Sequence, residues 1–410
     1  MRGSTEWRGT GPLRVRAYRR LWTVAALSHF GTWMHNTAAT AQLANFSAVP
    51  AVNALLPAAA TLPVFLLALP AGVLADRIGR GTVLFWANAA SALTAALFAA
   101  LDLAGALGPG ALLALTFGLN ASWAAAYPAW NAEVSSTLPA ELIKDGAALN
   151  SLSFNIARTL GPAAGGWLFG AVGALPVYAV NALSFAGFVL CFRRSRRIER
   201  LDDGPAGRRG AWQETTALVR ESVPYRALLT RAWLFFLLTQ VMFALTPVYL
   251  LTVRRLPEGV VGLVLAAFGF GAICSAVAYP VVRHVVTDRV LRASCASAAA
   301  LGLAVLPLAG NVGLLLVVAT VFGAAFACTI TMNNAFLQLS VALRLRSRAV
   351  ALYTVVLYGA QTLGALAAGA LASQWGVGPA AWVAAALLVV SAFAERPAGP
   401  GTRDRSGAQR

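Results

Sequence analysis

Residues 72–80 read GVLADRIGR, a short charged segment between two long apolar stretches. Its acid, Asp76, and its two arginines, Arg77 and Arg80, directly adjoin apolar sequence that is long enough to cross a lipid bilayer. Charges are costly inside hydrocarbon and are therefore expected at its edge. The segment predicts a tight loop at a membrane surface, joining two membrane-spanning helices.

The composition agrees with a membrane protein, because 59% of the 410 residues are hydrophobic and only 11% are charged. A water-soluble globule of this size would lack a polar coat. Apolar segments near the ~20 residues that a bilayer requires recur along the chain. They cover residues 21–46, 52–75, 82–101, 110–132, 148–172, 175–192, 228–251, 259–282, 289–309, 312–337, 349–372 and 379–394. We expect an all-α membrane protein with twelve transmembrane helices.

The net charge of +17 follows the expected membrane topology. If the helices alternate in direction, most lysines and arginines fall on one side, in segments 1–20, 76–81, 133–147, 193–231, 283–292, 344–348 and 396–410. The positive-inside rule places that side, with both termini, in the cytoplasm. This distribution excludes a nucleic-acid partner, and the strong preference for arginine over lysine favours a bacterial cytoplasmic membrane.

An internal repeat relates the two halves of the chain. Residues 148–182 align without gaps with residues 351–385, which pairs Gly161 with Gly364 and Gly166 with Gly369. Parallel halves of this kind are typical of transporters that bind their substrate between the halves, near the middle of the membrane.

With the repeat in view, segment 72–80 resembles the loop between helices 2 and 3 of the major facilitator superfamily of secondary transporters. The matching residues are Gly72, Asp76, Arg77, Gly79 and Arg80. The resemblance implies a gate that breaks and re-forms as the cytoplasmic side opens. A solvated turn that merely orients the helices by its charges is the alternative.

A second match lies in residues 161–166, GPAAGG, which resemble the antiporter motif of this superfamily. Gly161, Pro162, Gly165 and Gly166 would let the helix bend and approach a neighbour closely. Ordinary small-residue packing is the alternative. Glycines expected upstream in the motif are absent, and segment 110–132 has no arginine, which puts proton antiport in doubt.

Further features are similar to the enterobactin-exporter and macrolide-efflux-like branch, also called transmembrane secretion effectors. They are Trp33 after Gly31, the stretch 148–155, and Asn181 with its neighbours. The resemblance implies two pseudo-symmetric six-helix bundles. The expected division is an N-terminal bundle with its cytoplasmic tail at 1–192, a cytoplasmic linker at 193–227, a C-terminal bundle at 228–395 and a cytoplasmic tail at 396–410.

In this fold, helices 1, 4, 7 and 10 line the substrate cavity, and here each carries polar and aromatic residues at helical spacing. The cavity candidates are His29, Trp33, Asn36, Thr40, Asn120, Trp123, Tyr127, Asn131, Phe236, Gln240, Phe243, Thr331, Asn334 and Gln338. Such a lining suits a bulky, partly polar molecule. A single stripe of this kind more often serves hydrogen bonding between helices, and it is the four stripes together that favour a cavity.

Charged groups within or near the membrane are few. Arg158 is the one arginine placed deep within the membrane, and it predicts either a functional role such as contact with an anionic substrate, or a structural pair with Glu133 or a backbone carbonyl. Asp102 lies at the outer end of segment 82–101, and Glu133 lies at the inner end of segment 110–132. Proton coupling would have to use these acids, His29 or His35.

The sequence has no phosphate-binding P-loop and no cluster of metal-ligating residues, so we expect neither an enzyme, nor a cofactor, nor a bound metal. We expect a monomeric, proton-coupled exporter of a siderophore, drug or secondary metabolite that works by alternating access. An uptake permease and a non-transporting membrane sensor or scaffold are the alternatives.

Overall fold

The computed structural model describes residues 11–192, 219–341 and 343–393. Long α-helices make up nearly all of it: α1 (Arg16–Phe46), α2 (Pro50–Ile78), α3 (Arg80–Leu103), α4 (Pro109–Ser136), α5 (Ile143–Val172), α6 (Ala174–Phe192), α8 (Val223–Val248), α9 (Glu258–Val285), α10 (Asp288–Val305), α11 (Val312–Ser340), α12 (Leu343–Trp375) and α13 (Val377–Phe393). Short turns η1 (Gly11–Arg14), η2 (Ala140–Leu142), η3 (Tyr249–Val253) and η4 (Leu306–Leu308) complete it.

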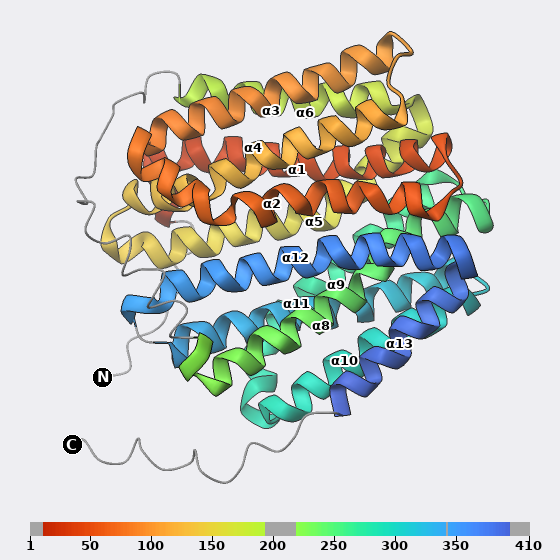
Figure 1. The fold of residues 1–410 in the computed structure, drawn as a ribbon. Coiled ribbons are helices and arrows are strands. Elements are labelled where there is room, and N and C mark those ends of the chain that lie inside the picture. Colours follow the sequence, from red (N-terminus) through yellow and green to blue (C-terminus); the bar gives the residue numbers. More distant parts are fainter. Residues whose placement is uncertain (1–10, 193–218, 342, 394–410) are drawn as a thin grey trace, which may run out of the picture.

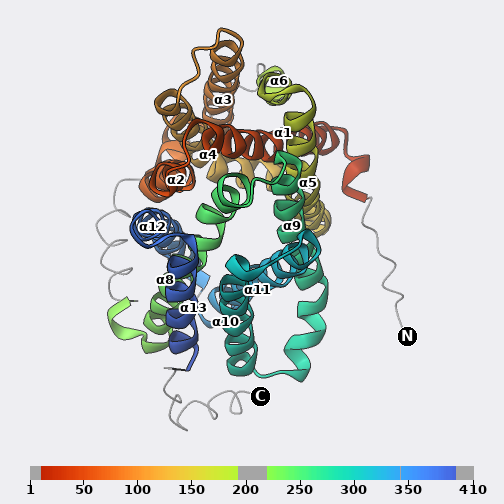
Figure 2. The same cartoon turned by 90° about the vertical axis from the view of Figure 1, so that its right-hand side faces the viewer.

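The helices run roughly side by side and alternate in direction (Figure 1). One end of the molecule is the end at which α1 begins and α13 ends, and we call it the terminal side. The other end, which faces the viewer in Figure 2, is called the opposite side. Gln338, Asn131 and residues 72–77 belong to helices, but their side chains lie outside the described part of the chain, as do residues 193–218 of the predicted linker and the whole predicted C-terminal tail.

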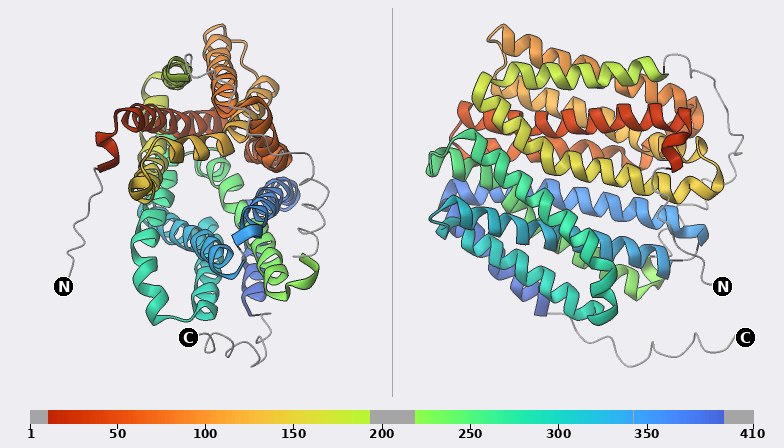
Figure 3. Two further views of the ribbon diagram at one scale, coloured as in Figure 1. Left: turned by 90° about the vertical axis from the view of Figure 1, so that its left-hand side faces the viewer. Right: turned by 180° about the vertical axis from the view of Figure 1, so that it is seen from behind.

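Helices α1–α6 pack among themselves, and so do α8–α13 (Figures 1 and 2). The main contacts between the two groups are α2 against α12 and α5 against α9. Figure 3 shows α5 and α9 adjacent in the view from behind. The two groups therefore meet along two helix pairs, with α1, α4, α8 and α11 between them.

Equivalent contacts recur in the two groups. The Tyr18 hydroxyl at the start of α1 donates to the Gly146 carbonyl of α5 at 2.7 Å. The Tyr225 hydroxyl at the start of α8 donates to the Ala349 carbonyl of α12 at 2.9 Å. Gly146 and Ala349 lie two residues before the aligned stretches 148–182 and 351–385 and have the same spacing, so the repeat corresponds to a repeated packing arrangement.

The predicted loop at residues 72–80 is shorter than the sequence suggests. Helix α2 continues to Ile78, α3 begins at Arg80, and Gly79 alone joins them. Gly79 has φ 86° and ψ 139°, a conformation that residues with a Cβ rarely adopt. Residues 72–78 of the predicted loop therefore form about the last two turns of α2. Polar sequence at a membrane surface is as compatible with a helix as with a loop.

Among the described residues, eight helices are long and apolar enough to span a membrane. The apolar part of α13, Val377–Ala392, is shorter than these. Helix α1 carries His29, Asn36 and Thr40 along one face, and these polar residues lower its mean hydropathy. The polar stripe that makes α1 a candidate cavity helix thus also weakens its signal as a membrane span.

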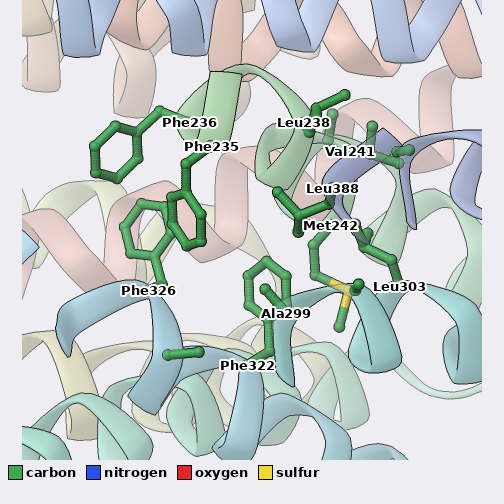
Figure 4. Close-up of a cluster of buried hydrophobic side chains, with 14 of the residues drawn as sticks. Phe235, Phe236, Leu238, Val241, Met242, Ala299, Leu303, Phe322, Phe326 and Leu388 are labelled. Carbon is green, nitrogen blue, oxygen red and sulfur yellow. The ribbon is translucent and has the colours of Figure 1, made fainter. Parts of the chain in front are cut away.

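The core of the second group is a continuous aromatic and aliphatic cluster between α8, α10, α11 and α13 (Figure 4). Phe236 and Phe322 are fully buried, and Phe326 contacts Phe236 edge to face at a centroid distance of 5.2 Å. Ala54 and Ala58 of α2 join the same cluster. This packing holds the second group together and fixes the helix faces that surround it.

Candidate functional site

Trp33 of α1 lies against α5. Its ring meets Phe154 edge to face at 6.0 Å, and the guanidinium carbon of Arg158 lies 5.8 Å from its centroid. A Cβ added to Gly161 would lie 2.6 Å from the Trp33 Cβ. The absence of a side chain at Gly161 therefore lets the indole lie close to α5, where its π face can stabilise the Arg158 cation.

Arg158 also reaches the other helix group. Tyr358 of α12 lies within electrostatic range of its guanidinium. Tyr358 in turn interacts with Tyr127 of α4, whose ring lies 4.9 Å from that of Trp123. We call Trp33, Trp123, Tyr127, Arg158 and Tyr358 the Arg158 cluster. It joins one cation to aromatic and phenolic groups from four helices and from both groups of the fold.

His29 lies beside this cluster, because its ring meets Phe154 edge to face at 5.3 Å. Its Nδ1 is buried without a hydrogen-bond partner. The other candidate histidine, His35, lies elsewhere, between Phe98 and Tyr178 at centroid distances of 4.4 and 4.7 Å. Of these two histidines, His29 is the one that lies beside the Arg158 cluster.

A second part of the candidate site is a cavity of about 150 Å³ between α1, α2, α4 and α8. Three sequence candidates line it, Asn36, Thr40 and Phe243. Asn53 and Thr116 also line it and were not predicted. Asn53 and Thr116 line the cavity because their helices lie close together, and the spacing of residues along one helix does not show this.

Other predicted cavity residues have different surroundings. Asn120 donates to the Thr116 carbonyl of its own helix at 2.9 Å. Gln240 is 4% exposed, and its Cβ would lie 3.0 Å from a Cβ added to Gly364 of α12. Asn334 is partly buried. The stripes thus divide between the central site and contacts between helices.

The glycines of α5 face two neighbours. A Cβ on Gly165 would lie 2.6 Å from the Met34 carbonyl oxygen of α1. A Cβ on Gly166 would lie 2.9 Å from the Gly262 Cα of α9. Pro162 contributes too, because its carbonyl oxygen would lie 2.5 Å from a Cβ on Gly262. The motif therefore serves close packing both within the first group and between the groups.

The corresponding contact in the other half joins α12 to α2. Gly369, the repeat partner of Gly166, packs against Ala54 and Ala51. Near mid-helix the hydroxyls of Thr61 and Thr362 lie 2.8 Å apart, and the Ala51 amide donates to the Ser373 hydroxyl at 3.0 Å. These contacts, like those between α5 and α9, lie from mid-depth to the opposite side.

Of the predicted acids, Asp102 ends α3 in a buried network. Gln42 of α1 donates to its carboxylate at 2.6 Å, and the Tyr178 hydroxyl donates to the Gln42 carbonyl at 2.5 Å. Glu133 is partly buried near the end of α4. Asp102 thus links α1, α3 and α6 on the opposite side, away from the Arg158 cluster.

Comparison with known proteins identifies the family. A family model described as "transmembrane secretion effector" matches residues 8–398. Among curated proteins, none matches the chain significantly.

Solved structures of similar fold include the nucleoside transporter NupG, with a TM-score of 0.74, 14% identity, and coverage of 92% of this chain and 98% of that one. A bacterial homologue of the iron transporter ferroportin in an inward-facing state has a TM-score of 0.71 at 16% identity, covering 92% and 99%. A D-xylose–proton symporter has a TM-score of 0.71 at 14% identity, covering 91% and 96%. The chain therefore belongs to the transmembrane secretion effector family and is a multi-pass membrane transporter of the major facilitator type rather than an enzyme.

Proposed function

We propose that this chain is a secondary active exporter with twelve transmembrane helices in two six-helix bundles. Residues 1–192 and 228–395 form the bundles, residues 193–227 join them, and 396–410 form the tail. The terminal side faces the cytoplasm of a bacterial cell. Packing of α1–α6 and of α8–α13 supports this division, and the arginine-rich segments support the orientation.

Alternating access by a monomer accounts for the contacts between the groups. The α5–α9 and α2–α12 contacts described above run from mid-depth to the opposite side, which favours a state closed on that side. Separation of these contacts, with closure on the terminal side, would expose the centre to the other face of the membrane.

The Arg158 cluster carries the proposal for the substrate. A membrane-embedded cation beside Trp33 and Tyr358, with Tyr127 next to Tyr358, suits a bulky anion with an aromatic or otherwise apolar body. Siderophores and acidic secondary metabolites have this character. We assign the substrate to this class, with small-molecule drugs of the same character included.

Direction and coupling are tested together in everted membrane vesicles. An exporter should accumulate its substrate in everted vesicles under an imposed pH gradient, and a protonophore should abolish the accumulation. Uptake by intact cells without accumulation in everted vesicles would instead establish a permease, the activity suggested by the D-xylose–proton symporter among the similar structures. Accumulation that survives the protonophore would exclude proton coupling.

The gate at residues 72–80 gives a separate prediction. We expect Asp76→Asn to lower the transport rate several-fold while leaving membrane insertion intact. A gate requires the negative charge of Asp76, whereas the helix end can fold and insert without it. The measurement is initial transport rate per inserted protein. The matched control is Glu141→Gln, an exposed acid of the α4–α5 connection on the same side. Equal rates for Asp76→Asn and the control would contradict a gating role.

A further inference from the structure

A second cavity, separate from the Arg158 cluster, lies within the second helix group. Its volume is about 280 Å³, and it lies between α8, α9, α10, α11 and α13, with Arg231, Arg283 and Asp288 of its lining exposed. The lining comes from the first turns of α8 and α10 and from the later turns of α9, α11 and α13. All of these lie toward the terminal side, so the cavity lies near one surface of the membrane.

On α11, the cavity adjoins the helix face that points away from the centre of the fold. Thr329, Asn333 and Phe336 line it from α11. At about 100° per residue, these positions lie on the face opposite to that of Thr331, Asn334 and Gln338. The cavity is therefore distinct from the predicted substrate stripe of the same helix.

Positive charge dominates its polar lining. Arg231 of α8, Arg283 of α9 and Arg292 of α10 all line the cavity, and Asp288 is the one acid among the described lining residues. Tyr279 adds a hydroxyl to the same lining. Guanidinium groups from three helices around one space form the donor arrangement that phosphate groups prefer.

The rest of the wall is apolar, with Leu228, Phe235, Met332 and Phe336 among the lining residues. The volume is at the lower limit of the ~300–1,000 Å³ typical of drug-sized ligands, so it suits a head group with a short attached segment. Basic pockets between helices at the cytoplasmic surface are sites where anionic lipid head groups bind.

We propose that this cavity binds a phosphate-bearing anion, presented either by an anionic phospholipid or by a soluble phosphate ester. The phosphate lies among Arg231, Arg283 and Arg292, and the attached organic group follows the apolar wall. The site is independent of the direction of transport, because it is lined by a single helix group.

The test uses the purified full-length chain. Phosphatidylglycerol in phosphatidylcholine nanodiscs and soluble glycerol 1-phosphate are titrated separately, and binding is followed by the rise in the thermal unfolding midpoint. Binding of phosphatidylglycerol alone identifies a lipid site, and binding of both identifies a site for the phosphate itself. Binding of neither overturns the proposal.

Variants separate the cavity from general surface charge. Arg283→Gln combined with Arg292→Gln should weaken binding about tenfold or more, because charge-assisted hydrogen bonds are lost. Arg289→Gln is the control, since Arg289 is an exposed residue of α10, the helix of Arg292, and does not line the cavity. Equal weakening by the control and the double variant would overturn the proposal.

Asp288→Asn should change the affinity for the anion in the opposite direction. Removing the carboxylate from the cavity should strengthen anion binding several-fold, a gain that misfolding cannot produce. If the double variant is too unstable to assay, Arg231→Gln at the exposed rim replaces it, with the same expected weakening. Unchanged or weaker binding by Asp288→Asn would contradict a site at this cavity.

Discussion

Replacing Arg158 by glutamine should reduce transport of an anionic substrate by about tenfold or more. A hydrogen bond to a charged group contributes about 1.5–3 kcal/mol, and about 1.4 kcal/mol corresponds to a factor of ten. Arg158 lies over Trp33 of the first helix group and within electrostatic range of Tyr358 of the second. Loss of its charge removes the cation from the proposed binding site.

The decisive measurement compares two forms of one compound. A carboxylic acid and its methyl ester share shape and apolar area but differ in charge, so Arg158→Gln should impair transport of the acid much more than that of the ester. Tyr358→Phe removes only the hydroxyl and should have a smaller effect in the same direction. Arg226→Gln, at an exposed position early in α8, is the control. Equal impairment of acid and ester would reduce Arg158 to a structural role.

Replacing Gly262 by leucine should nearly abolish transport. Any side chain at this position would meet the Pro162 carbonyl oxygen and the Gly166 Cα of α5, both backbone atoms that cannot turn away. The leucine must therefore push α5 and α9 apart. The chain should still insert, because the change adds apolar area, but the opposite side should no longer close.

Closure can be measured by cross-linking on a background without the native cysteines. The Ala51 amide donates to the Ser373 hydroxyl, so Ala51→Cys with Ser373→Cys should cross-link when the opposite side is closed. Gly262→Leu should lower the cross-linked fraction. Gly259→Leu is the matched control, since a Cβ at Gly259 of the same helix meets nothing within 4 Å. Normal cross-linking and transport in Gly262→Leu would refute the role assigned to this contact.

The fold could be predicted largely from segment length, because a bilayer demands helices of one approximate length. Helix ends were less predictable. Helix α8 begins at Val223, five residues before the predicted bundle, and α12 begins at Leu343 rather than near residue 349. Apolarity marks where hydrocarbon begins, whereas a helix can continue beyond it into the polar surface region.

The candidate site was predictable only in part. Trp33 and Tyr127 could be predicted because they lie on helices expected to line the cavity, and Arg158 because a charge within a membrane helix is costly. Tyr358 does not stand out, although the repeat pairs it with Asn155, a residue that belongs to the predicted motif region. The cavity lined by Arg283 and Arg292 depends on the meeting of helix ends distant in sequence, and no local pattern records such a meeting.

The two contacts between the helix groups also restrict the motion that the molecule can perform. The α5–α9 and α2–α12 pairs lie on either side of the centre and form two separate contacts between the helix groups. Two separated contacts define one axis about which the groups can rotate. Sliding of the groups past each other would break the Thr61–Thr362 hydrogen bond and bring side chains against the backbone at the glycines. The protein should thus behave mechanically as a device with one principal degree of freedom.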